Sequence, residues 1–234
     1  MADDAFLAGL DPPALLDREA ERLDVFFAAL PGGGWSRPSR CDGWTVRDVL
    51  AHLTSSEEYH HACLDGTVAV FLADFAAKGA TDVDAATAIA IAGLADVSTG
   101  ELLDRWRDAD VETRQGYRQR GDGTVDTSVG EYPARWQACH VALELATHAD
   151  DIGVPVTDDE RRSRLDWMAR VSCFALAEAK PDAVVSHTHG GTHVRIGAVD
   201  LTLDDNQLVA AVAARLDDSS GLDARTRAAL STMP

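Results

Sequence analysis

Apolar residues recur at helical spacing over most of the first 153 positions of the chain. The first run opens after Asp11-Pro12-Pro13, stops at Pro31, and contains Leu15, Leu16, Leu23, Phe26, Phe27 and Leu30. Asp is a favoured N-cap and proline is tolerated in the first helical turn. The pattern therefore predicts a helix over residues 12–30.

Further helices follow from cap signals that stand before similar runs. Thr45 with Asp48 resembles a capping box and opens a helix that extends to about residue 63. Ser98 with Glu101 opens another, over residues 102–120, and the residues expected to be buried there are Leu102, Leu103, Trp106 and Tyr117. Shorter helices are predicted over 71–78 and 85–94, and residues 121–131 are expected to form a polar connection.

Pro133 suits the first position of a fourth long helix, and Gly153 suits the position just after its end. Four long helices with one longer crossover predict a bundle. Beyond residue 155 the period changes: a helix begins at Thr157, short strands are predicted over 183–188, 193–198 and 200–203 with a turn at Gly190-Gly191, and a helix over 206–217. The predicted fold is therefore mainly α, with a four-helix bundle over residues 1–155 and a small α+β domain over 156–234.

The fourth long helix carries a stripe of polar residues on an otherwise apolar side. His140, Glu144 and His148 are spaced by four and so share a face, and Asp151 lies one turn further on. Buried imidazoles and carboxylates are costly unless something binds them. A metal ion is one explanation, and a hydrogen-bonded His/Glu pair without metal is the other.

A second candidate ligand, His52, lies on the helix that Thr45 opens, beside Val49 and Leu53. A histidine in such a place is often only a core residue, and His60 and His61 further along are expected near an exposed end. Together with Glu144 and His148, His52 would supply two imidazoles and one carboxylate. Three protein ligands are typical of catalytic zinc, and the same set also suits Fe(II). The sequence does not choose between the two metals, and we take Zn²⁺ as the default.

Composition narrows the classes of partner. The 234 residues carry a formal net charge of −18, which argues against nucleic-acid or anionic-membrane binding. No apolar run is long enough to span a membrane and no signal peptide is evident at Met1, so we expect a cytoplasmic protein.

All basic residues except Lys78 and Lys180 are Arg, which is typical of GC-rich, for example actinobacterial, genomes. Four dispersed cysteines predict buried thiols and no disulfide framework. The oligomeric state, monomer or homodimer, stays open.

Two motifs carry a resemblance. The string from Cys41 to Leu53, CDGWTVRDVLAHL, is followed some ninety residues later by Glu144 to Asp151, ELATHADD. In order and separation they resemble the DinB-like superfamily, and within it the mycothiol-dependent maleylpyruvate isomerase family. The resemblance covers residues 10–153 well and the remainder only loosely.

The resemblance implies a bundle that holds a divalent metal through His52, Glu144 and His148. It also implies mycothiol as a cosubstrate bound as thiolate, which metal coordination would favour at neutral pH. When a thiolate adds to a conjugated double bond, that bond becomes a single bond that can rotate, and expulsion of the thiolate then completes a cis-trans isomerisation. If the electrophile keeps the thiol instead, the protein is an S-transferase. No arginine of the C-terminal part can be matched to binding of a dicarboxylate, and Arg47 is expected on a solvated helix face, with Arg135 also near the ligands in sequence.

Other interpretations stay open at this point. The bundle could hold a structural metal and bind a small molecule without turnover, especially if His140 completes a four-ligand shell; otherwise His140 is a neighbour of the ligands or a substrate contact. Asp151 either orients a ligand by hydrogen bonding or is a solvated carboxylate at a helix end. A separate metal site at His187, His189 and His193 is a further, weaker possibility.

Overall fold

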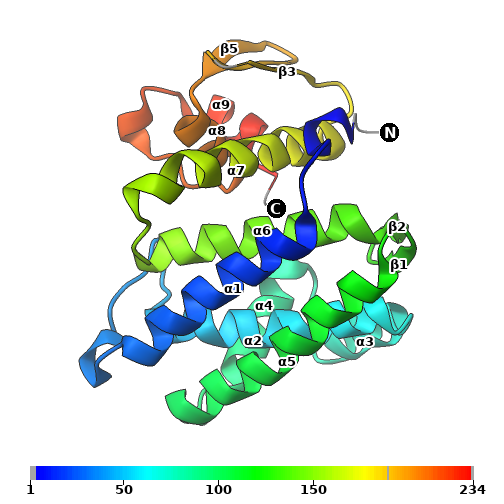
Figure 1. Cartoon of the computed structure of the whole chain (residues 1–234), viewed down its shortest axis with the longest axis vertical. Helices are drawn as coiled ribbons and strands as arrows, with labels where there is room; N and C mark the ends of the chain where they lie inside the picture. The colour runs from blue at the N-terminus through cyan, green and yellow to red at the C-terminus, as the bar shows by residue number, and fades with distance from the viewer. Residues whose placement is uncertain (1–3, 189, 233–234) are drawn as a thin grey trace. The chain divides into compact units, whose positions relative to one another are not determined.

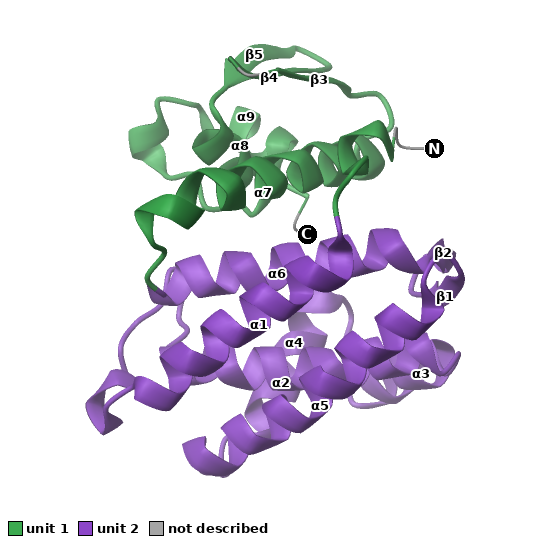
Figure 2. Ribbon diagram, viewed as in Figure 1, with its two compact units in different colours: residues 1–10, 155–234 green, residues 11–154 purple. Residues whose placement is uncertain are grey.

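The structure is a computed structural model, and it describes residues 4–188 and 190–232. The described residues fall into two compact units, coloured separately in Figure 2. Unit 2 comprises residues 11–154, and unit 1 comprises the described residues of 1–10 and 155–234. The start of the chain thus groups with the C-terminal part of the sequence, whereas we expected it with the bundle.

Unit 2 is the predicted four-helix bundle (Figure 1). Helix α1 packs on α6 and α2 packs on α5, while α3 and α4 form the crossover between α2 and α5 and both contact α2. The helices are α1 (Pro12–Ala29), α2 (Val46–Leu64), α3 (Val68–Ala77), α4 (Val83–Gly93), α5 (Thr99–Arg120) and α6 (Ala134–Ile152), with a short 3₁₀ turn η2 (Gly32–Gly34) after α1.

The helix boundaries follow the cap residues closely. Asp11 accepts a hydrogen bond from the amide of Ala14, and Thr45 and Asp48 form a complete capping box. Only half of the capping box predicted at Ser98 forms, because the Glu101 carboxylate instead accepts from Arg105 at 2.6 Å. Helix α6 ends where Gly153 adopts a left-handed φ of 75°. The bundle core is built from large buried side chains of all four long helices, among them Leu16, Leu23, Phe27, Leu50, Leu53, Leu102, Trp106 and Leu145.

The predicted polar connection between α5 and α6 is wrong in one respect. Residues 121–133 contain an antiparallel hairpin of β1 (Thr124–Thr127) and β2 (Gly130–Pro133). Each strand has only four residues, which is too short for a clear alternation in sequence. Pro133 is the last residue of β2 and the N-cap of α6, one position before the predicted place.

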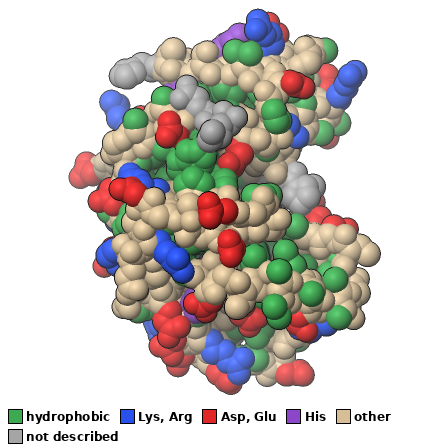
Figure 3. All heavy atoms as spheres, turned by 90° about the vertical axis from the view of Figure 1, so that its right-hand side faces the viewer, with side chains coloured by type: hydrophobic (Ala, Val, Ile, Leu, Met, Phe, Trp, Pro, Cys, Tyr) green, Lys and Arg blue, Asp and Glu red, His purple; other side chains and the backbone are tan. Residues whose placement is uncertain are grey.

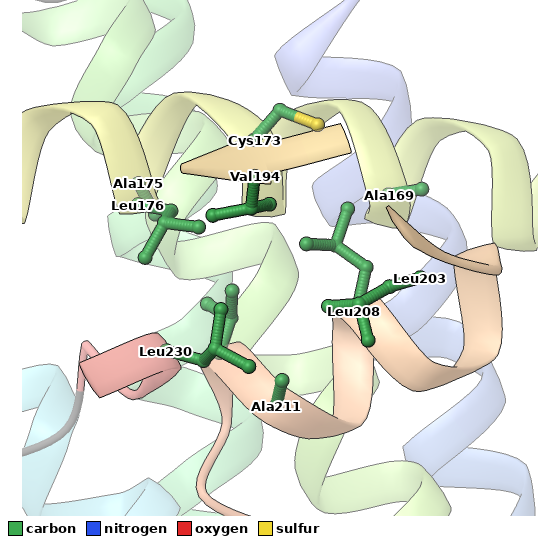
Figure 4. Close-up of a cluster of buried hydrophobic side chains, with 10 residues drawn as sticks. Ala169, Cys173, Ala175, Leu176, Val194, Leu203, Leu208, Ala211 and Leu230 are labelled. Carbon is green, nitrogen blue, oxygen red and sulfur yellow. The ribbon is translucent and has the colours of Figure 1, made fainter. Parts of the chain in front are cut away.

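The described part of unit 1 combines the helices α7, α8 and α9 with a three-stranded antiparallel sheet of order β3-β4-β5. Its apolar core joins α7, the inner face of the sheet, α8 and α9, as Figure 4 shows for Leu176, Val194, Leu208 and Leu230. The elements are η1 (Asp4–Leu7), α7 (Asp158–Ala179), β3 (Val184–Thr188), β4 (Gly191–Ile196), β5 (Val199–Leu203), α8 (Asp205–Val212), η3 (Asp218–Ser220) and α9 (Ala224–Leu230).

The last predicted helix is too long. We expected it over residues 206–217, but α8 ends at Val212 and is followed by Ala214 with a positive φ of 56°. A second short helix, α9, which the sequence did not indicate, begins after the N-cap Asp223 and contributes Leu230 to the core.

The surface charge and the state of the cysteines agree with what the composition predicted. Acidic side chains are spread over the face shown in Figure 3 and not gathered in one patch. All four cysteines lie within the described residues, where they are buried and form no disulfide, as predicted. Within the described residues, no helix has the length and apolar character needed to cross a membrane.

Candidate metal centre

Two polar stripes, one on α2 and one on α6, meet inside the bundle. The stripe on α2 is His52, Ser56 and His60, and the stripe on α6 is His140, Glu144 and His148. Each member is four residues from the next, so both stripes lie along one helix face. Their contacts join residues about ninety positions apart in the sequence.

His52, Glu144 and His148 converge at one point. Their possible ligand atoms all lie within 4.8 Å of one another, and His52 Nε2 is 3.2 Å from Glu144 Oε1. Ligands bound tetrahedrally to zinc at 2.0–2.1 Å lie roughly 3.3 Å apart, so the His52–Glu144 separation already fits. Two imidazoles and a carboxylate are also a donor set that zinc and Fe(II) both accept.

The other side of His148 is held by Asp151. His148 Nδ1 lies 3.2 Å from Asp151 Oδ2, which leaves Nε2 as the nitrogen free to bind an ion. Burial lowers the pKa of His148 despite the nearby carboxylate, so the neutral imidazole that a metal requires is favoured. Asp151 is itself buried, and its Oδ2 also accepts a hydrogen bond from the Cys41 thiol at 3.1 Å. A solvated carboxylate at the helix end is therefore wrong for Asp151, and its contacts are those of a group that orients His148.

Glu144 is surrounded by donors from α2. Ser56 Oγ donates to Oε1 at 3.1 Å, and His60 Nε2 lies 3.6 Å from Oε2. Burial raises the pKa of Glu144, but the contacts with His52 and His60 outweigh it and hold the pKa well below its usual range. The carboxylate is therefore ionised, as a metal ligand must be. The expectation that His60 lies near an exposed end is wrong: it is buried, because α5 and α6 both cover this face of α2.

A second buried carboxyl group lies one turn before His60. Glu57 is 2% exposed and accepts a hydrogen bond from the Thr113 hydroxyl at 2.5 Å. Burial raises the pKa of Glu57 to about 7, and the nearby Asp110 and Glu144 carboxylates also raise it, against the lowering effects of His60 and the Thr113 hydrogen bond. Near neutral pH this group is therefore partly protonated.

Trp44 forms an aromatic wall beside the converging imidazoles. Its ring centroid lies 5.2 Å from that of His52 and 6.3 Å from that of His148. The residue is only partly buried and stands immediately before the N-cap of α2. The indole thus limits the directions from which a small molecule could reach these two histidines.

The loop before α2 is tied to the end of α6. The Arg37 guanidinium donates to the carbonyl oxygen of Ile152 at 2.8 Å, and the amide of Arg40 donates to that of Asp151 at 2.9 Å. With the Cys41 thiol on Asp151, these contacts form what we call the loop clasp. It fixes the start of the helix that carries His52 against the end of the helix that carries His148.

Other predicted candidates lie elsewhere. His140 Nε2 is 3.1 Å from the Tyr132 hydroxyl. Among the described residues, two groups could hold an ion, His52 with Glu144 and His148, and Cys41 with His148 and Asp151, and His140 belongs to neither. Arg47 is not on a solvated face, because its guanidinium donates to the carbonyl oxygens of Leu94, Ala95 and Val97. Arg135 is half exposed and faces Asp122 at 3.6 Å.

Within the described residues, the C-terminal sheet does not bring together His187 and His193, two members of the possible second metal site. His187 pairs across the sheet with Thr192, and His193 pairs with Ser186, so the two histidines point to opposite faces. His187 Nδ1 lies 2.8 Å from the Thr192 hydroxyl, while His193 Nε2 lies 2.8 Å from Asp200. His189 lies outside the described residues.

Four further residues contact this centre, although the sequence pattern predicted no role for them. Cys41 and Trp44 lie in the motif that carries the resemblance, but nothing in their spacing shows that they reach α6. Ser56 and His60 follow His52 at steps of four, and that spacing could have revealed them.

Comparison with known proteins identifies the family. Residues 16–153 match the family model described as mycothiol maleylpyruvate isomerase N-terminal domain. The chain belongs to the mycothiol maleylpyruvate isomerase N-terminal domain family. The match includes every residue of the candidate centre, and it confirms the resemblance drawn from the two motifs.

Solved structures show the same fold over more of the chain. A crystal structure of the mycothiol-dependent maleylpyruvate isomerase is similar with a TM-score of 0.62 at 15% identity, covering 91% of this chain and 93% of that one. A mutant of that enzyme with one histidine replaced by alanine gives 0.61 at 14% identity, with the same coverage. At such identity the likeness shows the fold, a bundle of this family followed by a small α+β unit. No curated protein is similar enough to the chain to count as a relative.

Proposed function

We propose that this protein is a divalent-metal-dependent enzyme that uses mycothiol to isomerise an electrophilic small molecule of the maleylpyruvate type. The observation that carries the proposal is the convergence of His52, Glu144 and His148 within 4.8 Å, inside the region matched by the family. Zn²⁺ is the metal we favour, because two imidazoles and one carboxylate leave a fourth position for a thiol. When bound, the ion would lower the pKa of that thiol and so supply a thiolate at neutral pH.

The residues of the chain have distinct parts in this proposal. Burial lowers the pKa of His148 and so favours its neutral imidazole, and Asp151 holds Nδ1 so that Nε2 can bind the ion. Glu144 is ionised and offers Oε1 on the side of His52. Trp44 covers both imidazoles and would exclude water from one side of the reacting groups. The thiolate would add to the conjugated double bond of the substrate, and its negative charge would pass to the conjugated carbonyl group as an enolate. The resulting single bond would rotate, and re-formation of the double bond would expel the thiolate and give the isomer.

Two further functions remain alternatives. An electrophile that retains the thiol would make the same site that of an S-transferase, and no residue distinguishes the two. A non-catalytic metal-binding and ligand-binding module is less well supported, since His140 does not join the ligands and the described set is three, not four. We further propose that the protein is cytoplasmic, that it binds neither nucleic acid nor a membrane, and that it is a monomer or a homodimer.

Metal analysis followed by turnover tests the proposal. We expect stoichiometric divalent metal in the purified protein and its loss in His52→Ala, Glu144→Ala and His148→Ala. The control is His193→Ala, which removes a histidine on the outer face of the C-terminal sheet and should keep the metal. Retention of metal by all three ligand variants would refute the site.

Turnover is then measured with maleylpyruvate and a panel of activated alkenes and epoxides. An isomer with the thiol recovered supports the isomerase, and a stable thioether with the thiol consumed supports the transferase. If metal-loaded protein binds a ligand but converts none of these substrates in the presence of mycothiol or glutathione, the protein is a binding module and not an enzyme.

A further inference from the structure

His60 is buried at a place where its polarity is costly. Its side chain is 5% exposed, and its Nδ1 is buried without a hydrogen-bond partner among the described residues. An unsatisfied buried polar atom costs about 1–3 kcal/mol. The rings of Tyr59 and Tyr117 stand edge-on to it, at centroid distances of 5.7 Å and 6.4 Å. An apolar residue would suit these neighbours better, so the contact made by the other nitrogen, Nε2, needs an explanation.

That contact divides the two oxygens of Glu144 between different partners. Oε1 faces His52 Nε2 at 3.2 Å and Ser56 Oγ at 3.1 Å, on the side where the candidate ligands converge. Oε2 faces His60 Nε2 at 3.6 Å, a polar contact a little longer than a hydrogen bond. One oxygen of the Glu144 carboxylate thus faces the candidate metal ligands, and the other faces the interior of the bundle.

The division matters for coordination. A carboxylate can bind a metal through one oxygen or through both, and binding through both fills a position that a cosubstrate would need. An N–H group that holds the second oxygen favours binding through one. Neighbours that orient ligands in this way typically change metal affinity or activity by 10–100-fold when removed.

We propose that His60 is a positioning residue that holds Oε2 of Glu144 and so keeps Glu144 a one-oxygen ligand with a coordination position open for the thiol. This inference rests on the proposed function. It concerns the geometry of Glu144 and not the identity of the substrate, so it applies equally to the isomerase and to the transferase.

The variants separate the two ring nitrogens. In His60→Gln the side-chain amide can occupy the place of Nε2 and still donate to Glu144, whereas in His60→Asn the shorter amide reaches only the place of Nδ1. His60→Leu is a second variant without a donor, and its apolar side chain suits the buried surroundings if His60→Asn does not fold. The matched control is His61→Gln, since His61 is the next residue and its Nε2 lies 3.0 Å from the carbonyl oxygen of Ala109, away from the centre.

The measurement is the visible absorption spectrum of the full chain titrated with Co²⁺, since four-coordinate Co²⁺ absorbs far more strongly than Co²⁺ of higher coordination number. We expect strong, four-coordinate spectra for the unmodified protein, His60→Gln and His61→Gln. For His60→Asn and His60→Leu we expect a weaker spectrum of higher coordination number and Co²⁺ affinity lowered roughly 10-fold or more. A role of His60 in folding alone would change stability but leave the spectrum of the folded variants unaltered.

Identical spectra and affinities for the unmodified protein and the donor-free variants would overturn the inference while leaving the proposed function intact. Failure of His60→Gln to restore the spectrum would also overturn it. If the unmodified protein binds no Co²⁺, then the proposed metal site fails first, and this result is distinct from the other two.

Discussion

Replacement of Asp151 by Asn tests whether the carboxylate behind His148 contributes to metal binding. The change keeps the shape of the side chain but removes its charge. Asp151 Oδ2 serves two buried donors, His148 Nδ1 at 3.2 Å and the Cys41 thiol at 3.1 Å. An Asn carbonyl oxygen in the place of Oδ2 can still accept from both donors, so the expected loss reflects charge and ligand basicity and not a missing hydrogen bond.

The size of the effect can be worked from these contacts. Hydrogen bonds to charged groups contribute about 1.5–3 kcal/mol and neutral ones about 0.5–1.5 kcal/mol, a difference of roughly 1–2 kcal/mol. At 1.4 kcal/mol for each factor of ten, this corresponds to about 5–30-fold weaker binding, which overlaps the lower part of the range of about 10–100-fold that is typical of groups that orient a metal-binding histidine.

The assay is competition for Zn²⁺ with a chromophoric chelator, with the free energy of unfolding of the metal-free protein measured in parallel. The control is Asp122→Asn, since the Asp122 side chain is 92% exposed in the same unit. Zinc affinity of Asp151→Asn equal to that of the control would show that the contact with His148 has no part in metal binding.

The remaining predictions concern stability. Burial raises the pKa of Glu57 to about 7, so the folded state keeps a proton that the unfolded state loses above about pH 4.5. This group should therefore lower the free energy of unfolding as the pH rises from about 4.5 through about 7, by on the order of 3 kcal/mol in total. His60, Asp110 and Glu144 face this carboxyl group, and urea unfolding at pH 5–8 should show a flatter dependence for Glu57→Gln; an unchanged slope would contradict the assignment. Arg47→Met should lower the free energy of unfolding by about 2–3 kcal/mol, because three carbonyl oxygens after α4 lose a charged donor, and a loss no larger than that for exposed Arg105→Met would refute this. Gly191→Ala should destabilise unit 1 by at least about 2 kcal/mol in thermal unfolding, since its φ is +121° and a Cβ would meet the carbonyl oxygen of Leu203 at 2.6 Å; a neutral result would exclude this close approach.

The sequence predicted the bundle because its signals are local. Cap residues such as Asp11 and Thr45 act within one turn, and the apolar stripes of α1, α2, α5 and α6 are long. The hairpin between α5 and α6 was missed because four-residue strands give too little alternation, and α9 because seven residues give too little periodicity.

The candidate centre was predicted only in part, for a related reason. Spacing along one helix places His148 and Glu144 on a common face, and the two motifs added His52. Whether a side chain at the far end of such a face is buried depends on which other helices cover it, and the sequence does not show this for His60. In the same way, the carbonyl oxygens that receive the Arg47 guanidinium become available only once α4 ends beside α2.

The loop clasp has a consequence for the order of events during synthesis and folding. Its contacts join residues 110 and 115 positions apart, and the Ser56–Glu144 hydrogen bond spans 88. Contacts of such long sequence separation form late, after local helices and neighbouring pairs, because closing a long loop costs entropy before any contact offsets it. A nascent chain that has not yet emerged as far as Ile152 cannot complete the clasp or hold His148 in place. We therefore expect the candidate centre to form after translation of the whole bundle, so that the metal that we propose would bind to a nearly finished fold and would not direct its folding.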